Sequence, residues 1–149
     1  MSAHVEAICI SERKGEIKHA VAAIELRREH GLVGDAHAGP GHRQVSLLAA
    51  ESIATVRALI PDLAHGAFAE NIVIRGLDLT AVGVGARLRL GGACLEVTQI
   101  GKECHQGCAI QKITGDCIMP REGVFCRVVD GGQLTTGDTV VIDRPGPTS

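Results

Sequence analysis

Hydrophobic and polar residues alternate along several short stretches of the chain, a pattern typical of β-strands that bury one face. Near the N-terminus, Val5, Ala7 and Cys9 alternate with polar or small neighbours. Residues 87–90 alternate in the same way and run into a Gly-Gly turn. The alternation also predicts strands at residues 21–26, 94–100, 124–129 and 139–142.

Glycine-rich turns separate these stretches. The chain contains 19 glycines, and pairs such as Gly91-Gly92 and Gly137-Asp138 are typical turn signals. Many short strands punctuated by glycine are characteristic of barrels and sandwiches. We therefore expect a mainly β fold.

One clear helix is predicted at residues 49–60. Ile53, Val56 and Ile60 fall on one face at helical spacing, and Pro61 ends the pattern. A second stretch, at residues 103–112, is expected to be helical or looped. The helix and the strands together indicate a β-rich α+β fold.

The length of 149 residues matches one ordinary domain that buries its own core. No internal repeat, linker or block of charge divides the chain. We therefore expect one domain over residues 1–143, followed by a disordered tail at residues 144–149.

Composition argues against several classes of partner. Phe68 and Phe125 are the only aromatic residues, and the formal net charge is −2, so base stacking and a basic nucleic-acid footprint are both missing. The N-terminal residues do not resemble a signal peptide, and no apolar run is long enough to span a bilayer. We expect a cytoplasmic protein, in which the six cysteines are thiols or metal ligands rather than disulfides.

Four of the six cysteines lie within residues 101–126, so sulfur or metal chemistry is expected there. One interpretation is a structural zinc site, in which Cys104, His105 and Cys108 act as ligands. Only Cys104 and Cys108 have the spacing of a zinc knuckle, because the later gaps, before Cys117 and Cys126, are eight residues each.

A second interpretation is a reactive thiol that carries sulfur as a persulfide. Such a thiol needs partial exposure and a lowered pKa, which His105, Arg121 or the nearby lysines would supply. A third interpretation is that the cysteines are small buried hydrophobic residues. We expect this third role for Cys9, Cys94 and Cys126, which lie in apolar strands.

Residues 31–41 form a glycine-rich segment that contains Asp35 and His37 and leads to Arg43 and Gln44. The segment matches neither a Walker loop nor a dinucleotide-binding fingerprint. Glycines let backbone N–H groups approach an anion, and an arginine grips a phosphate or oxoanion bidentately. The alternative is an ordinary turn in which Asp35 and His37 bond to the backbone and Arg43 is solvated.

Two polar pairs interrupt apolar stretches at Glu70-Asn71 and Arg121-Glu122. Each pair either completes a pocket or is satisfied by the backbone, and the sequence leaves both alternatives open. Arg121 follows Pro120 beside the cysteines, so we prefer it as a positive charge that faces a ligand and stabilises a thiolate.

Several of these motifs, taken in order, resemble the MOSC domain, which is the C-terminal domain of molybdenum cofactor sulfurases and also occurs as small bacterial proteins. The resemblance extends over roughly residues 3–143. It is carried by the Glu-Cys-His-x-x-Cys-Ala-Ile sequence at residues 103–110 and by the segments at 31–39, 42–48, 68–72, 76–79, 82–85, 115–132 and 137–138.

The resemblance implies a closed, mixed β-barrel and a cysteine that carries sulfur for the molybdenum cofactor or another metal centre. Cys108 matches the family's cysteine motif most naturally, and Cys104 is the second candidate. Gly107 stands where larger members often have proline. The pyridoxal phosphate domain of the sulfurases is a separate unit that this chain lacks, so no pyridoxal phosphate site is expected.

The resulting hypothesis is a protein of molybdenum cofactor metabolism that binds the cofactor or an oxoanion. Asp35, His37, Arg43, Gln44 and Arg121 would contact the ligand. The expected partners are enzymes that make or sulfurate the cofactor, with a cysteine desulfurase as sulfur donor. The alternatives are a binding or sensing module without chemistry and a structural Cys/His metal site.

Overall fold

The computed structural model describes residues 3–13, 18–36, 38–41, 44–61, 63–66, 68, 70–101 and 123–144. Strands make up most of this part of the chain, and α1 (Ala50–Arg57) is its one α-helix. Across these residues, no helix has the length and apolar character that crossing a bilayer requires.

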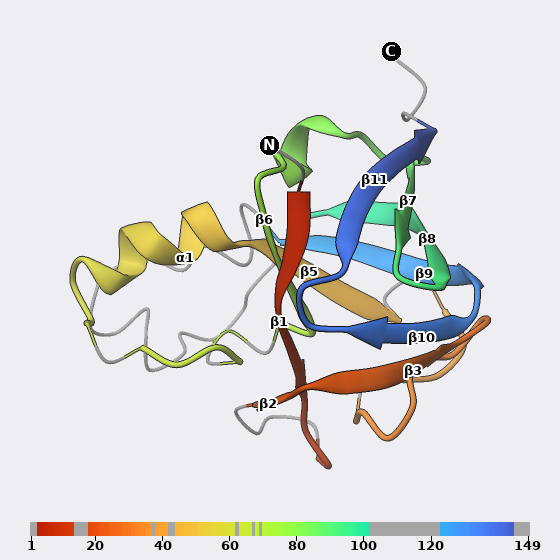
Figure 1. Cartoon of the computed structure of the whole chain (residues 1–149), viewed down its shortest axis with the longest axis horizontal. Helices are drawn as coiled ribbons and strands as arrows, with labels where there is room; N and C mark the ends of the chain where they lie inside the picture. The colour runs from red at the N-terminus through yellow and green to blue at the C-terminus, as the bar shows by residue number, and fades with distance from the viewer. Residues whose placement is uncertain are drawn as a thin grey trace.

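Seven strands form a closed barrel (Figure 1). Their order around the barrel is β11-β7-β8-β9-β5-β6-β1, and pairing of β1 with β11 closes the ring. The β5–β6 pair is parallel and the other pairs are antiparallel, so the predicted closed and mixed barrel is confirmed. The strands are β1 (Ala3–Ile10), β5 (Val45–Ala49), β6 (Ile72–Arg75), β7 (Arg87–Leu90), β8 (Ala93–Ile100), β9 (Val124–Asp130) and β11 (Thr139–Arg144).

The remaining strands extend the barrel at one side. β2 (His19–Val21) pairs with the end of β1. β3 (Ala23–Arg27) lies between β10 (Gly132–Thr135) and β4 (Gly31–Leu32) in a separate three-stranded sheet. The first two residues of the glycine-rich segment form β4, so the pairing of β4 with β3 joins the start of the segment to this second sheet.

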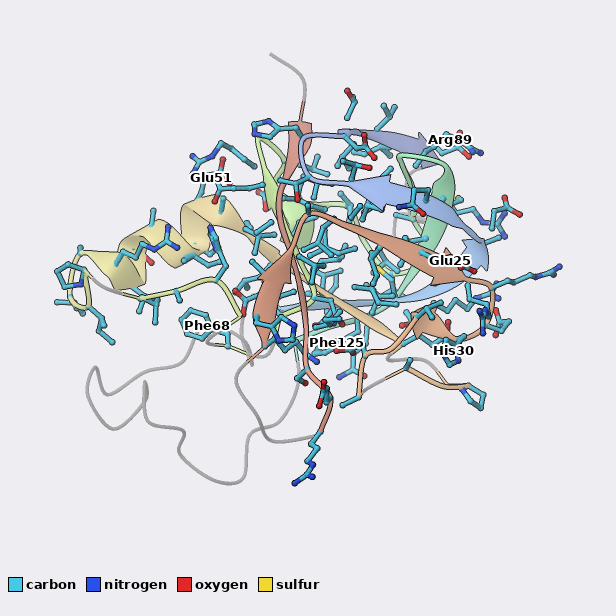
Figure 2. The ribbon with its side chains drawn as sticks, turned by 60° about the horizontal axis from the view of Figure 1, so that its bottom comes forward. Glu25, His30, Glu51, Phe68, Arg89 and Phe125 are labelled. Atoms are coloured by element: carbon cyan, nitrogen blue, oxygen red, sulfur yellow. The ribbon has the colours of Figure 1, made fainter. Side chains whose placement is uncertain are left out.

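Alternation along the strands produces two hydrophobic clusters. In β5, Leu47 belongs to the cluster inside the barrel and Leu48 to a second cluster outside it. The outer cluster includes α1, whose buried face carries Ala50, Ile53 and Val56. Phe68 and Phe125, the two aromatic residues, belong to the outer cluster, and Figure 2 shows their side chains.

The predicted helix is confirmed but is shorter than expected at its C-terminal end. Beyond Arg57 the backbone forms a tighter turn than an α-helix, since the Leu59 N–H donates to the Val56 carbonyl three residues back. The Leu59 side chain is exposed, whereas Ile60 still packs against the outer cluster. The short 3₁₀ helix η1 (Leu79–Ala81) supplies one of the expected short helical turns.

The strand expected at residues 21–26 is in fact two strands. β2 pairs with β1 in the barrel, whereas β3 pairs with β10 in the second sheet, so the chain changes sheet at Ala22. β11 includes Arg144, where a disordered tail was predicted to begin. Strands β4, β6 and β10 were not predicted, and residues 103–112 lie outside the described residues.

The contrast between the barrel interior and the surface gives a direct test of the core. Leu47→Ala removes a side chain that is 0% exposed, whereas Leu59→Ala removes one that is 68% exposed. We expect Leu47→Ala to lower the free energy of unfolding by about 2–5 kcal/mol because it leaves a cavity. Leu59→Ala is expected to change it by less than about 0.5 kcal/mol. Urea unfolding measures both, and equal losses would contradict the assignment of the core.

Candidate functional site

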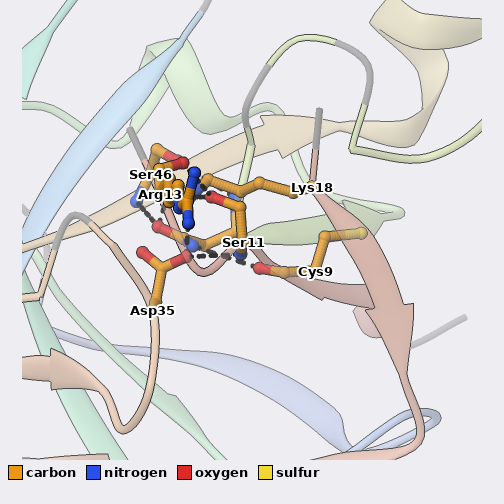
Figure 3. Close-up of polar contacts among 7 residues, drawn as sticks. Cys9, Ser11, Arg13, Lys18, Asp35 and Ser46 are labelled. Carbon is orange, nitrogen blue, oxygen red and sulfur yellow. Dashed lines mark hydrogen bonds and ion pairs between the residues drawn. The ribbon is translucent and has the colours of Figure 1, made fainter. Parts of the chain in front are cut away.

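A cluster of buried polar side chains lies where β1 ends (Figure 3). Its Ser46 alternates in β5 with Val45 and Leu47, which face the barrel interior, so Ser46 faces outward. The cluster therefore lies on the outer face of the barrel, on the side of the outer hydrophobic cluster. This polar cluster consists of Ser11, Lys18, Asp35, Ser46, Glu70 and Asn71.

An ion pair between Lys18 and Asp35 lies at its centre, and both side chains are 0% exposed. Lys18 Nζ lies 2.6 Å from Asp35 Oδ1 and donates to Ser11 Oγ at 3.3 Å. The Ser11 N–H also donates to Asp35 Oδ1, at 3.1 Å. Three segments of chain, at Ser11, Lys18 and Asp35, are joined by these bonds.

The pKa of the Asp35 carboxyl shows which of two opposing effects is larger. Burial alone would raise this pKa, because a dry environment disfavours the charge. Hydrogen bonds from Lys18, Ser11 and Asn71, together with the charge of Lys18, outweigh burial and hold the pKa below its usual value. Asp35 is therefore a carboxylate at neutral pH.

Asn71 joins the strands beside the ion pair. Its Oδ1 accepts the Ser46 N–H at 3.0 Å and the Ser46 hydroxyl at 3.2 Å. Its Nδ2 donates to the Cys9 carbonyl at 3.1 Å. One side chain thus ties β1, β5 and the start of β6 together at the polar cluster.

Glu70 holds the turn that precedes β6. Its two carboxylate oxygens accept the N–H groups of Gly66 at 2.9 Å and Phe68 at 3.0 Å. Burial raises the pKa of Glu70, and the two N–H donors oppose this only in part. Of the two alternatives for Glu70-Asn71, the backbone-satisfied pair is the one observed.

The glycine-rich segment is fixed at its start and at its end. A Cβ on Gly31 would lie 2.6 Å from the Gln44 carbonyl oxygen, so only glycine allows these two backbones to approach. Gln44 is buried, and its Nε2 donates to the Gly41 carbonyl at 2.9 Å while its Oε1 accepts the Val128 N–H at 2.9 Å. The segment is thereby held against β9.

The predicted ligand-contacting residues fall into two groups. Asp35 and Gln44 are placed, and both direct their polar groups into the protein, where they hold the glycine-rich segment. Their contact with a ligand stays a prediction. His37, Arg43 and Arg121 lie outside the described residues.

Three of the six cysteines lie in the barrel, and all three are free and buried, as predicted. Burial, with the charge of Glu70, raises the pKa of the Cys9 thiol to about 12. Burial also raises the pKa of Cys126 and of Cys94 above their usual value. These thiols remain protonated at neutral pH, so they are poor nucleophiles.

The other three cysteines, Cys104, Cys108 and Cys117, lie outside the described residues together with His105. The described chain closes the base of this stretch, because the Gly101 N–H donates to the Gly123 carbonyl at 2.7 Å. Among the described residues, no three His, Cys, Asp or Glu side chains gather in a way that would hold a metal ion.

The base of this stretch is close to the polar cluster. Phe125, two residues beyond Gly123, is the partner of Ser46 in the β5–β9 pairing. Ser46 in turn bonds to Asn71, and Asn71 bonds to Asp35 in the glycine-rich segment. The barrel therefore brings the base of residues 102–122 and the glycine-rich segment to the same outer face.

The sequence did not identify Lys18 or Ser11 as residues of this site. No local pattern singles out Lys18, because its partner Asp35 is 17 residues away and the two meet only in the fold. Polar residues inside apolar stretches were a usable signal for Asn71. The same signal was present at Ser46, which lies between Val45 and Leu47.

Breaking the ion pair should lower the stability of the fold. Lys18→Met leaves the Asp35 carboxylate buried without its cation, and Asp35→Asn leaves the Lys18 ammonium without its anion. We expect each change to lower the free energy of unfolding by about 3–5 kcal/mol at neutral pH, and the double variant to lose less than the sum. Urea unfolding of the four proteins measures this, and additive losses would contradict the pairing.

The pH dependence of the Asp35→Asn effect gives a control. Because the folded pKa of Asp35 lies below the unfolded value near 3.8, its carboxylate stabilises the fold fully above that value. The difference in the free energy of unfolding between the wild-type protein and Asp35→Asn should therefore be constant at neutral pH. It should shrink as the pH falls through the folded pKa of Asp35.

Comparison with known proteins agrees with this architecture. The solved structure of YuaD from Bacillus subtilis superimposes with a TM-score of 0.77 at 21% identity, over 94% of this chain and 94% of that chain. YiiM from Geobacillus stearothermophilus superimposes with a TM-score of 0.71 at 18% identity, over 94% of this chain and 74% of that chain. YiiM from Escherichia coli gives 0.65 at 20% identity, over 95% and 69%. These likenesses establish a shared fold.

No curated protein sequence matches the chain. The family model of the MOSC domain matches residues 34–141, which is most of the chain and includes residues 34–41 of the glycine-rich segment, α1 and the cysteine-rich stretch. The chain therefore belongs to the MOSC domain family, a family associated with the biology of the molybdenum cofactor.

Proposed function

We propose that this protein binds the molybdenum cofactor, or a phosphate or oxoanion part of it, at the glycine-rich segment. We also propose that it carries sulfur on a thiol within residues 102–122. Cys108 is the first candidate for this thiol and Cys104 the second. The observation that carries the second proposal is the burial of Cys9, Cys94 and Cys126 in the barrel.

The three barrel thiols are excluded as sulfur carriers because they are not ionised. Sulfur transfer needs a thiolate, and burial keeps these three thiols protonated. Their side chains also have no access for a donor protein. Chemistry at a cysteine of this chain is therefore assigned to the remaining stretch, where Lys102, His105 and Arg121 supply positive charge that favours a thiolate.

The proposed transfer conserves atoms and electrons. The thiolate of Cys108 attacks the outer sulfur of a persulfide on a cysteine desulfurase, and a new S–S bond forms on Cys108. The S–S bond of the donor breaks at the same time, and the donor cysteine leaves as a thiolate. Release of the outer sulfur as sulfide would break the new S–S bond, regenerate the Cys108 thiol and consume two electrons, which two molecules of an external thiol would supply by forming a disulfide. The cofactor would be the acceptor of that sulfide.

Backbone geometry supports anion binding at the glycine-rich segment. Gly34, Gly39 and Gly41 have φ values of 90°, 144° and 131°, and each has open space where a Cβ would stand. The Gly39 N–H already donates to the His30 carbonyl, so the N–H groups proposed to face an anion are those of Gly34 and Gly41. Arg43 and His37 would add the positive side chains, and Arg121 would add a third from beside the cysteines.

Sulfur loading tests the carrier role. After incubation with a cysteine desulfurase and cysteine, we expect intact-mass spectrometry to show one added sulfur atom on the wild-type protein. Cys108→Ser should abolish the adduct, and Cys94→Ala should keep it because Cys94 is buried. Loss of the adduct in Cys104→Ser alone would move the role to Cys104. An unchanged adduct in the Cys104→Ser/Cys108→Ser double variant would refute the assignment to this pair.

Anion binding is tested separately with tungstate as the probe. We expect calorimetry to detect tungstate binding, and Arg43→Gln to weaken it on the order of ten- to a hundredfold through the loss of charged hydrogen bonds. Arg89→Gln is the matched control, because Arg89 pairs with Asp143 at the surface, in the β7–β11 pair. Stoichiometric zinc in the purified protein would instead favour a structural metal site.

A further inference from the structure

We propose that Lys18 is the positioning residue of the glycine-rich segment, and this inference rests on the proposed anion binding there. The Lys18 ammonium holds the Asp35 carboxylate in place, and through it the backbone of residues 31–41. It also neutralises that carboxylate, so that an anion can bind to the segment without a buried negative charge beneath it.

The composition of the segment makes Asp35 its principal anchor. Asp35 and His37 are the only residues among 31–41 with polar side chains, since all the others are glycine, alanine, valine, leucine or proline. The backbone adds further ties, such as the Ala36 N–H to the Ser11 carbonyl at 2.8 Å and the Gly39 N–H to the His30 carbonyl at 2.7 Å. At its two ends the segment is held by Leu32, which packs in the core, and by the Gln44 side chain, which bonds to Gly41. Asp35 is thus the polar side chain of the described segment that fastens its middle to the barrel.

Glycine gives the segment little stiffness of its own. Four of its residues are glycines with positive φ, and at Gly34, Gly39 and Gly41 nothing lies within 4 Å of the position that a Cβ would take. A backbone of this kind loses much conformational entropy on ordering, and no side-chain packing compensates at these positions. Its order therefore depends on the anchor at Asp35.

Lys18 is itself held firmly, as a positioning residue must be. Its N–H donates to the Gly66 carbonyl at 3.1 Å, and a Cβ on Gly66 would lie only 2.0 Å from the Lys18 carbonyl oxygen. Immediately afterwards the chain enters β2, which pairs with β1. The ammonium therefore reaches Asp35 from a backbone fixed on the barrel (Figure 3).

The charges around the pair explain why a cation is required. Without Lys18, the Asp35 carboxylate would be buried directly behind the backbone that is proposed to receive an anion, with Glu70 as a second acidic group in the polar cluster. Like charges repel strongly where water is excluded. Lys18 thus supports anion binding through both the position of the segment and its charge.

Hydrogen exchange of the ligand-free protein tests the positioning role. We expect amides of residues 31–41 to exchange at least tenfold faster in Lys18→Met than in the wild-type protein, because the segment opens locally. Lys18→Arg keeps a cation and should largely restore protection. Asp143→Asn removes the surface pair with Arg89 and should leave the segment unchanged. Wild-type protection in Lys18→Met would overturn the proposal.

The double variant Lys18→Met/Asp35→Leu separates positioning from global stability, and it remains informative even where Lys18→Met fails to fold. Removing both charges should recover much of the stability measured by urea unfolding. The Ser11 N–H then lacks its carboxylate acceptor, so exchange of residues 31–41 should stay fast. Restored protection in this variant would show that apolar side chains at these two positions are enough to hold the segment. That result would refute a positioning role for the ammonium.

Tungstate calorimetry on the same proteins separates the two proposals. If the wild-type protein binds tungstate, Lys18→Met and the double variant should bind it at least tenfold more weakly, and Lys18→Arg should bind nearly as well as the wild type. Unchanged affinity in Lys18→Met would overturn the role of Lys18. If the wild-type protein does not bind tungstate, the proposed anion binding fails, while the exchange data still decide whether Lys18 positions the segment.

Discussion

The buried ion pair between Lys18 and Asp35 joins parts of the chain that the barrel alone does not hold together. It connects the end of β1 at Ser11 and the chain before β2 to the glycine-rich segment. Burying two charges is expensive, and a pair of apolar residues often stabilises a fold equally well. The ion pair also fixes the position of the Asp35 carboxylate, because hydrogen bonds hold the carboxylate at one place. The middle of the segment takes its position from that point, while Leu32 in the core and the Gln44 side chain hold its two ends.

The barrel divides the cysteines into two sets. Cys9, Cys94 and Cys126 are packed into it and kept protonated by burial. The remaining three belong to residues 102–122, outside the described part of the chain, and the two ends of this stretch, Gly101 and Gly123, are bonded to each other near the polar cluster. A barrel whose own thiols stay protonated leaves the other cysteines as the candidates for sulfur chemistry, which suits a protein that handles sulfur at one position. This division is the physical basis of the proposed function.

Sequence patterns predicted the parts of the fold that depend on local alternation. β1, β7, β8 and β9 were found because one face of each is apolar, and α1 because its apolar residues repeat at helical spacing. β4 and β10 were missed because they are short and begin with glycine, and β6 because residues 72–74 are uniformly apolar and buried. The family resemblance supplied the closed barrel. The ion pair could not be predicted, since nothing near Lys18 in sequence indicates that Asp35 will be its partner.

We propose that the glycine-rich segment and the cysteine-rich stretch form one site on the outer face of the barrel. A crystal of the protein soaked in tungstate measures this directly, because tungsten scatters anomalously and locates the anion. We expect tungstate bound to backbone N–H groups of residues 31–41, with the sulfur of Cys108 or Cys104 facing the same site. An anion bound on another face, or sulfurs of Cys104, Cys108 and Cys117 gathered around a metal ion, would contradict it.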